Sequence, residues 1–182
     1  MTSKLKTDVL ETVSGSGTIA LTNQLSGMTS ASLPSGTVLQ VVYANVTSGN
    51  LTTSSTSYVD TSCAASITPT SSSSKILVQA NAHVYVDNNT ANNWSAANFD
   101  ITRGGTQVFE SSPGPTTGYT FGRYTTDANL RNMGLVPITY LDSPSTTSAV
   151  IYRLRVASRS GYNIQLNTGF GHHNITLIEI AG

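Results

Sequence analysis

One segment constrains the fold of this chain more than any other. In residues 75–87, KILVQANAHVYVD, every second side chain is apolar, and those between are polar or aromatic except Leu77. Such strict alternation is typical of a β-strand with one face in a core and the other outside it. The segment therefore predicts a long antiparallel strand whose core must be closed by further strands. The positions expected to face that core are Ile76, Val78, Ala80, Ala82, Val84 and Val86.

Shorter segments of similar character recur along the chain, with turn residues between them. Arg-Gly-Gly at 103–105 predicts a tight hairpin, because glycine takes positive φ without strain. The chain has only three Lys and three Glu, so exposed helices lack their usual residues. The strands are expected at 37–46, 56–62, 75–87, 96–104, 106–111, 134–142, 148–158, 162–167 and 174–180.

These strands predict an all-β protein, most simply an antiparallel jelly-roll β-sandwich head over residues 34–182. The segment before it, LETVSGSGTIALTNQLSGMTS at 10–30, is too short and too rich in Gly, Ser and Thr to fold alone. We interpret residues 1–33 as an extended N-terminal attachment arm, which could reach on the order of 100 Å. A disordered tail is the alternative. Four residues suit the addition of strands to a partner's sheets: Val9, Val13, Ile19 and Leu21.

Charge and composition exclude several classes of partner. The formal net charge is zero and the pI is near 6.8, which argues against binding nucleic acid. No segment has the roughly 20 apolar residues of a membrane span, and residues 1–13 predict no signal peptide. Cys63 is the single cysteine, so no intrachain disulfide is possible. Charged residues make up 10% of the chain, which favours burial of much of its surface in an oligomer.

No catalytic motif emerges, and the sequence predicts neither an enzyme nor a cofactor. The carboxylates Asp60, Asp87, Asp100, Asp127 and Asp142 are spread over different strands and loops. His172 and His173 are the best metal candidates, yet neighbours on a strand face opposite sides and do not easily chelate one ion. A ring of one histidine from each of three chains is the alternative to polar turn residues. We predict no metal site.

Two long segments, 87–98 and 111–133, are expected to be loops that carry function. They combine the only tryptophan with other aromatic residues, arginine and asparagine, a composition typical of recognition surfaces. The alternative is that Trp94 and Phe121 close the ends of the sandwich or pack against a neighbouring subunit. The residues expected to bind a receptor are Asn93, Trp94, Tyr119, Phe121, Arg123 and Tyr124.

Parts of the chain resemble a known group of proteins. TDVLETVSGSGTIALTNQLSG, residues 7–27, resembles the N-terminal arms of bacteriophage virion proteins, notably those of cyanophages and marine phages. The segments GTVLQVVYANV, SSSSKILVQANAHVYV and the final ITLIEIAG resemble the trimeric C1q/TNF-type jelly-roll heads found in phage fibres.

The resemblance implies a homotrimer with its last strand near the molecular axis. That strand has apolar side chains on both faces, as expected when it lies between a core and a neighbour; they are Ile175, Leu177, Ile178 and Ile180. It further implies a virion structural protein assembled in the host cytoplasm, most simply a short trimeric tail fibre. Its arm would dock on a tail hub, baseplate, adaptor or capsid protein, and its head would contact a cell-surface glycan.

Three other functions are alternatives to this one. A capsid-anchored head fibre or decoration protein would use the same arm and the same head. A soluble lectin-like domain that binds carbohydrate would need no particle. An enzyme that degrades host polysaccharide is the least favoured, because such enzymes usually have a larger β-helix body.

Overall fold

The computed structural model describes residues 33–88, 92–118, 120–127, 130–166 and 171–182. Within these ranges every regular element is a β-strand, and the strands form two antiparallel sheets of six and five strands. Side chains from both sheets share one hydrophobic core, which makes the architecture a β-sandwich. The prediction of an all-β, antiparallel protein is confirmed.

Sheet A runs in the order β1-β11-β4-β10-β2, with β8 paired to the other side of β4. The central strand β4 pairs with β8 along nearly its whole length, and with β11 and then β10 on its opposite side. The strands of sheet A are β1 (Val38–Val46), β2 (Leu51–Thr53), β4 (Lys75–Asn88), β8 (Leu130–Asp142), β10 (Ile164–Leu166) and β11 (His173–Ile180).

Sheet B runs in the order β3-β9-β5-β6, with β7 paired to the same side of β5 as β6 but nearer the start of that strand. The strands of sheet B are β3 (Val59–Ile67), β5 (Asn93–Arg103), β6 (Thr106–Glu110), β7 (Phe121–Thr125) and β9 (Val150–Ser158).

The long strand predicted at 75–87 is confirmed as β4. Its six apolar positions are at most 2% exposed and belong to the core between the sheets. The hairpin predicted at Arg-Gly-Gly is also confirmed, because Arg103 pairs with Thr106 across Gly104 and Gly105. Both glycines have positive φ, 56° and 87°, as a tight two-residue hairpin requires.

The two predicted long loops are shorter than expected. β5 begins at Asn93, so Trp94 lies in a strand and not in a loop, and β7 occupies residues 121–125 within the second segment. The strand β2 and the second half of β3 were also not predicted. β2 is only the three residues Leu-Thr-Thr, and the second half of β3 reads Cys-Ala-Ala-Ser-Ile, so both give a weak strand signal in the sequence. They pair because neighbouring strands supply the hydrogen-bonding edge, and context of this kind outweighs intrinsic propensity in β-sheets.

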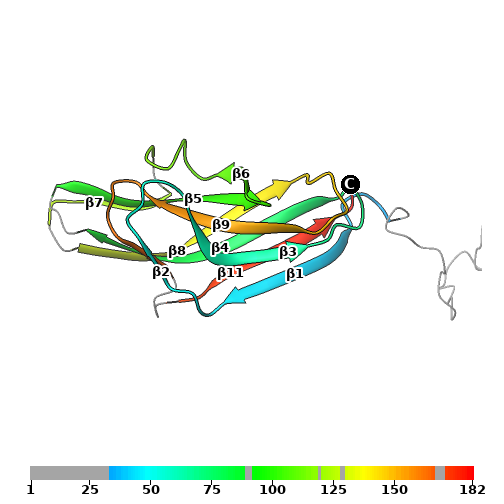
Figure 1. The fold of residues 1–182 in the computed structure, drawn as a ribbon, viewed down its shortest axis with the longest axis horizontal. Helices are drawn as coiled ribbons and strands as arrows, with labels where there is room; N and C mark the ends of the chain where they lie inside the picture. The colour runs from blue at the N-terminus through cyan, green and yellow to red at the C-terminus, as the bar shows by residue number, and fades with distance from the viewer. Residues whose placement is uncertain (1–32, 89–91, 119, 128–129, 167–170) are drawn as a thin grey trace, which may run out of the picture.

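The first described residues lie beside the C-terminus. The Gly36 N–H donates to the Ala181 carbonyl and the Ala181 N–H donates to the Thr37 carbonyl, each at 2.8 Å. Figure 1 shows the C-terminus at one end of an elongated body and β7 at the opposite end. The predicted arm residues Val9, Val13, Ile19 and Leu21 lie outside the described residues.

Candidate functional site

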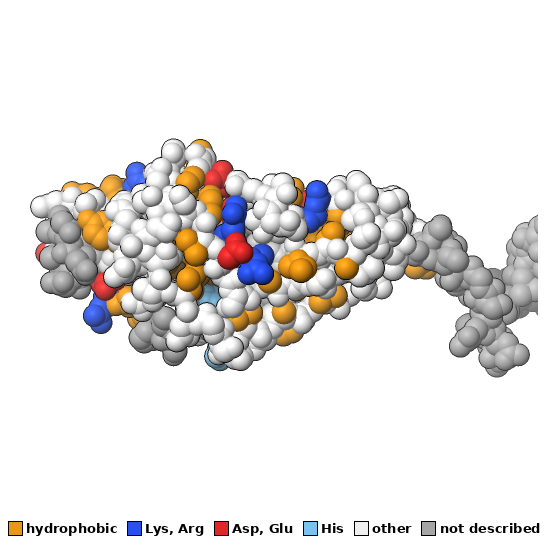
Figure 2. Space-filling view, in the orientation of Figure 1, with side chains coloured by type: hydrophobic (Ala, Val, Ile, Leu, Met, Phe, Trp, Pro, Cys, Tyr) orange, Lys and Arg blue, Asp and Glu red, His pale blue; other side chains and the backbone are white. Residues whose placement is uncertain are grey.

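An aromatic pair lies at the end of the sandwich remote from the C-terminus. Trp94 of β5 is the cross-strand partner of Tyr124 of β7, and their ring centroids are 5.5 Å apart at an interplanar angle of 59°. Tyr124 is 46% exposed, whereas Trp94 is partly buried. We call Trp94, Tyr124 and the adjacent Arg159 the distal cluster; Figure 2 shows hydrophobic side chains at this end.

Arg159 completes the distal cluster and was not singled out from the sequence. Its guanidinium carbon lies 5.8 Å from the centre of the Trp94 ring, within the range of a cation–π contact. The Arg159 backbone N–H donates to the Ala96 carbonyl at 2.9 Å, which fixes the residue just beyond the end of β9. No local sequence signal marks this contact, because 65 positions separate Arg159 from Trp94 in the chain.

The other predicted recognition residues do not join the distal cluster. Side chains alternate between the two faces of a strand. Phe121 and Arg123 are therefore on the face of β7 opposite to Tyr124. Phe121 packs against the core, and its ring reaches so close to Gly134 that a Cβ there would be 2.6 Å from it. Phe121 therefore helps to close the end of the sandwich, which was the alternative weighed for it. Tyr119 lies outside the described residues.

Asn93 has a bridging contact of its own. Its side-chain amide donates to the Tyr162 hydroxyl at 2.6 Å, and its carbonyl oxygen accepts from the Trp94 N–H at 2.8 Å. Tyr162 precedes β10 of sheet A, so this bond ties the start of β5 in sheet B to the other sheet. Asn93 therefore supports the backbone of Trp94 from the inner side of the strand.

The outer face of sheet A is apolar at one end. Val41, Ile178, Leu77 and Leu141 are successive cross-strand partners on β1, β11, β4 and β8. The next two rows continue with uncharged side chains, Tyr43–Thr176–Gln79–Thr139 and Asn45–Asn174–Asn81–Pro137. We call these three rows the uncharged face. Several of its apolar side chains are strongly exposed, including Val41 at 58%, Tyr43 at 60% and Leu141 at 48%.

The residues predicted to form a trimer interface divide between the two faces of β11. Ile175 and Leu177 are fully buried in the core of the single chain, so they cannot contact a partner, and this part of the prediction needs correction. Ile178 and Ile180 point outward and are partly exposed. The division follows from the alternation of side chains along a strand, because residues of one parity face the core.

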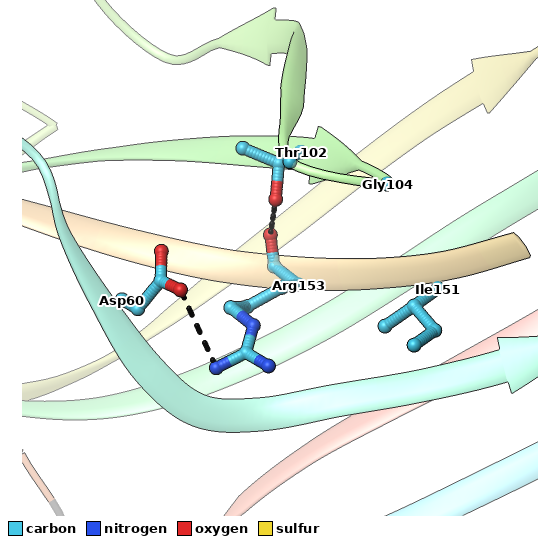
Figure 3. Close-up of a pocket in the computed structure, with 6 residues that line it drawn as sticks. Asp60, Thr102, Gly104, Ile151 and Arg153 are labelled. Carbon is cyan, nitrogen blue, oxygen red and sulfur yellow. Dashed lines mark hydrogen bonds and ion pairs between the residues drawn. The ribbon is translucent and has the colours of Figure 1, made fainter.

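The outer face of sheet B is charged where that of sheet A is not. Figure 2 shows positively and negatively charged side chains gathered near the middle of this face. Asp60 and Arg153 form an exposed ion pair at 3.5 Å beside a hollow of about 200 Å³, shown in Figure 3. The hollow is lined by Asp60, Thr102, Gly104, Gly105, Ile151 and Arg153. It is smaller than the roughly 300–1,000 Å³ of ordinary ligand pockets.

A second ion pair on this face is buried. Arg155 contacts both carboxylate oxygens of Asp100, which is fully buried, with one bond of 2.9 Å from Nε. Burial raises the pKa of Asp100, and the adjacent Arg155 opposes that rise. Burial raises the pKa of Tyr58, whose ring lies under the Arg155 guanidinium. The ion pair with Asp100 and the contact with the Tyr58 ring hold the Arg155 side chain in place.

Two further buried carboxylates are satisfied by neighbouring side chains. Asp142 accepts hydrogen bonds from the Tyr152 hydroxyl at 2.6 Å and from Arg103 at 2.7 Å. Glu179 accepts from the Gln40 amide and from the backbone N–H and hydroxyl of Thr70. These hydrogen bonds lower the pKa of Glu179 against the effect of its burial. Each carboxylate joins segments at the end of the sandwich near the C-terminus.

The histidines show the opposed placement that the sequence predicts. His172 is exposed, and His173 is 1% exposed with no hydrogen-bond partner for either ring nitrogen among the described residues. Burial, followed by the nearby His83 and His172, lowers the pKa of His173 to about 4. Over the described ranges, no group of three or more His, Cys, Asp or Glu could hold a metal ion. No helix in the described part of the chain has the length and apolarity of a membrane span.

No protein-family model matches this chain, and no curated protein matches it in sequence. The uncharged face and the distal cluster are the two surface features that bear on the function of the protein.

Proposed function

We propose that this protein is a structural protein of a bacteriophage particle, a short trimeric tail fibre whose sandwich contacts the host surface. In this proposal residues 1–33 dock on other structural proteins of the particle. The observation that carries the proposal is the uncharged face, because it combines exposed apolar side chains with an absence of charge over three rows. A surface of this kind is typical of an interface between subunits.

We further propose that the sandwich is a jelly roll. A jelly roll consists of two four-stranded sheets connected by Greek-key crossovers. With β2, β7 and β10 set aside, the strands run β1-β11-β4-β8 in sheet A and β3-β9-β5-β6 in sheet B, so the chain repeatedly crosses between the sheets. That order supports the proposal, with β2, β7 and β10 as short additions at the distal end.

The trimer is supported by the contrast between the two outer faces. On sheet B, charged pairs and residues 111–118 occupy the outer surface, and Asn98 donates to the Pro115 carbonyl at 2.9 Å. On sheet A, no loop of the described chain covers Val41 or Leu141, which remain about half exposed. Subunits that associate through sheet A would remove this apolar surface from water while leaving the charges of sheet B outside.

The positions of the chain ends fit the direction of a fibre. The predicted arm would enter the sandwich beside Gly36 and the C-terminus, and the distal cluster lies at the opposite end (Figure 1). One end is then available for attachment to the particle, and the other for contact with a cell.

The experiment that tests this proposal compares two charge substitutions on opposite sheets. Val41→Asp places a carboxylate on the uncharged face, where desolvation in a subunit interface costs several kcal/mol. Ile151→Asp is the matched control, since Ile151 is 50% exposed on the outer face of sheet B. Sedimentation should give three times the 19.1 kDa chain mass for the unchanged protein and for Ile151→Asp, and a smaller species for Val41→Asp.

A stable monomer for the unchanged protein would refute the trimer. Equal behaviour of the two variants would show that the uncharged face is not the interface. Cryo-EM of intact particles then tests where the protein resides: density on the tail supports the proposal, density on the capsid supports a head fibre, and absence from particles supports a free lectin-like protein.

A further inference from the structure

We propose that the distal cluster is a binding site for the apolar face of a neutral pyranose sugar. The sugar ring would stack on the Tyr124 ring, and its edge would contact Trp94. The role of this site in host contact rests on the proposed function, in which the end bearing β7 faces the cell. The binding itself is argued from the geometry of the described side chains.

The two rings form a corner suited to a small ring-shaped ligand. Their centroids are 5.5 Å apart and their planes meet at 59°, so the rings do not stack on each other. Tyr124 leaves 46% of its surface exposed in the single chain. The face of an aromatic ring carries partial negative charge, and it attracts the weakly positive C–H groups that line one side of a pyranose ring.

The size of the cluster favours a sugar over a protein partner. Two aromatic side chains offer at most about 300–500 Å² between them. A stable protein interface needs about 800 Å² on each partner. The apolar part of a single sugar ring is of the size that this corner can cover.

Arg159 acts as a positioning residue in this site. Its guanidinium lies 5.8 Å from the Trp94 ring centre, and its backbone is fixed by the bond to Ala96. Asn93 fixes the same tryptophan from the other side through the bond that its side chain accepts from the Trp94 N–H. Trp94 is therefore held before a ligand arrives, which reduces the entropy lost on binding.

The cluster favours a neutral sugar over a cationic ligand. The Arg159 guanidinium lies 5.8 Å from the centre of the Trp94 ring, so a positive charge stands beside the two rings. The Arg159 guanidinium beside the Trp94 ring would repel a cationic ligand. The hydroxyls of a neutral sugar can exchange hydrogen bonds with water around the rim of the corner, while its C–H face lies on Tyr124.

The tryptophan itself supplies the assay. Trp94 is the only tryptophan of the chain, so its fluorescence reports this site without a label. The full-length protein is titrated with the methyl glycosides of glucose, galactose, mannose and N-acetylglucosamine. At least one glycoside should give a saturable change with a midpoint on the order of 1–10 mM, as expected for a single shallow site.

Three variants separate stacking from a general disturbance. Tyr124→Ala should weaken binding by about tenfold or more, which corresponds to the loss of roughly 1.4 kcal/mol of stacking. Tyr124→Phe keeps the ring and should bind nearly as well as the unchanged protein. Ile151→Ala, on the same sheet but away from the cluster, should bind equally well.

Two results would overturn the inference: no saturable response to any of the glycosides, or an equal response in Tyr124→Ala. Sedimentation of the same samples separates this failure from failure of the proposed function. A trimer that does not respond to the glycosides overturns the site alone. A monomer that does respond overturns the fibre proposal and leaves the site intact.

Discussion

Lowering the pH from 7.5 to 5 should destabilise the folded chain through His173. This side chain is 1% exposed on the inner face of β11, and neither ring nitrogen has a hydrogen-bond partner among the described residues. Protonation of a buried imidazole without a hydrogen-bond partner costs free energy, because the positive charge is removed from water. The folded state therefore holds it neutral at a pH where the unfolded chain already binds a proton.

The magnitude follows from the two pKa values. Burial lowers the pKa of His173 from its ordinary value of 6.5 to about 4 in the folded state. Above pH 6.5 both states are neutral at this residue and its contribution does not change. Between pH 6.5 and 4 the unfolded state binds more protons, so the free energy of unfolding decreases as the pH decreases. The full loss is about 3 kcal/mol, of which about 2 kcal/mol is reached by pH 5.

The assay is urea denaturation of the unchanged protein at pH 7.5 and 5, at one fixed protein concentration, with the same measurement on two variants. His173→Leu removes the titrating group and should lose most of the difference of about 2 kcal/mol between the two pH values. His172→Gln is the control, because His172 is the exposed neighbour, and it should keep the difference. The reasoning is refuted if His173→Leu shows the same pH dependence as the unchanged protein.

Three further outcomes are expected. Arg155→Met leaves the buried Asp100 without its partner and should lower the free energy of unfolding by about 3–5 kcal/mol in denaturant titrations. Arg153→Met breaks an exposed ion pair and should lower the free energy of unfolding by less than about 1 kcal/mol. Equal losses in the two variants would contradict the stronger role given to the buried pair. Burial raises the pKa of Cys63 to about 12, so its thiol should resist alkylation at pH 8 until denaturant is added, and rapid labelling of the native protein would refute its burial. Deletion of residues 1–30 should leave a folded trimer, measured by sedimentation, that is absent from purified particles. Normal incorporation of the truncated protein would place the docking surface in the sandwich.

Local structure could be predicted from the amino-acid sequence wherever its pattern was strong. Alternation over residues 75–87 identified the central strand and its inner face, and the two glycines at 104 and 105 identified a hairpin. Both signals are local, since side-chain alternation and the positive φ of glycine depend on neighbours along the chain. The opposite placement of His172 and His173 followed from the same rule.

The tertiary structure alone decided which of these residues meet. The last strand is apolar at consecutive positions, so composition could not tell that Ile175 and Leu177 belong to the core while Ile178 faces outward. The aromatic residues of the two predicted loops were all candidates for one site, yet the register of β5 and β7 pairs Trp94 with Tyr124. The same register turns Phe121 inward, and the end of β9 brings Arg159 to the tryptophan. Register and sheet order depend on hydrogen bonds between distant segments, and a shift of one residue would exchange the two faces of a strand.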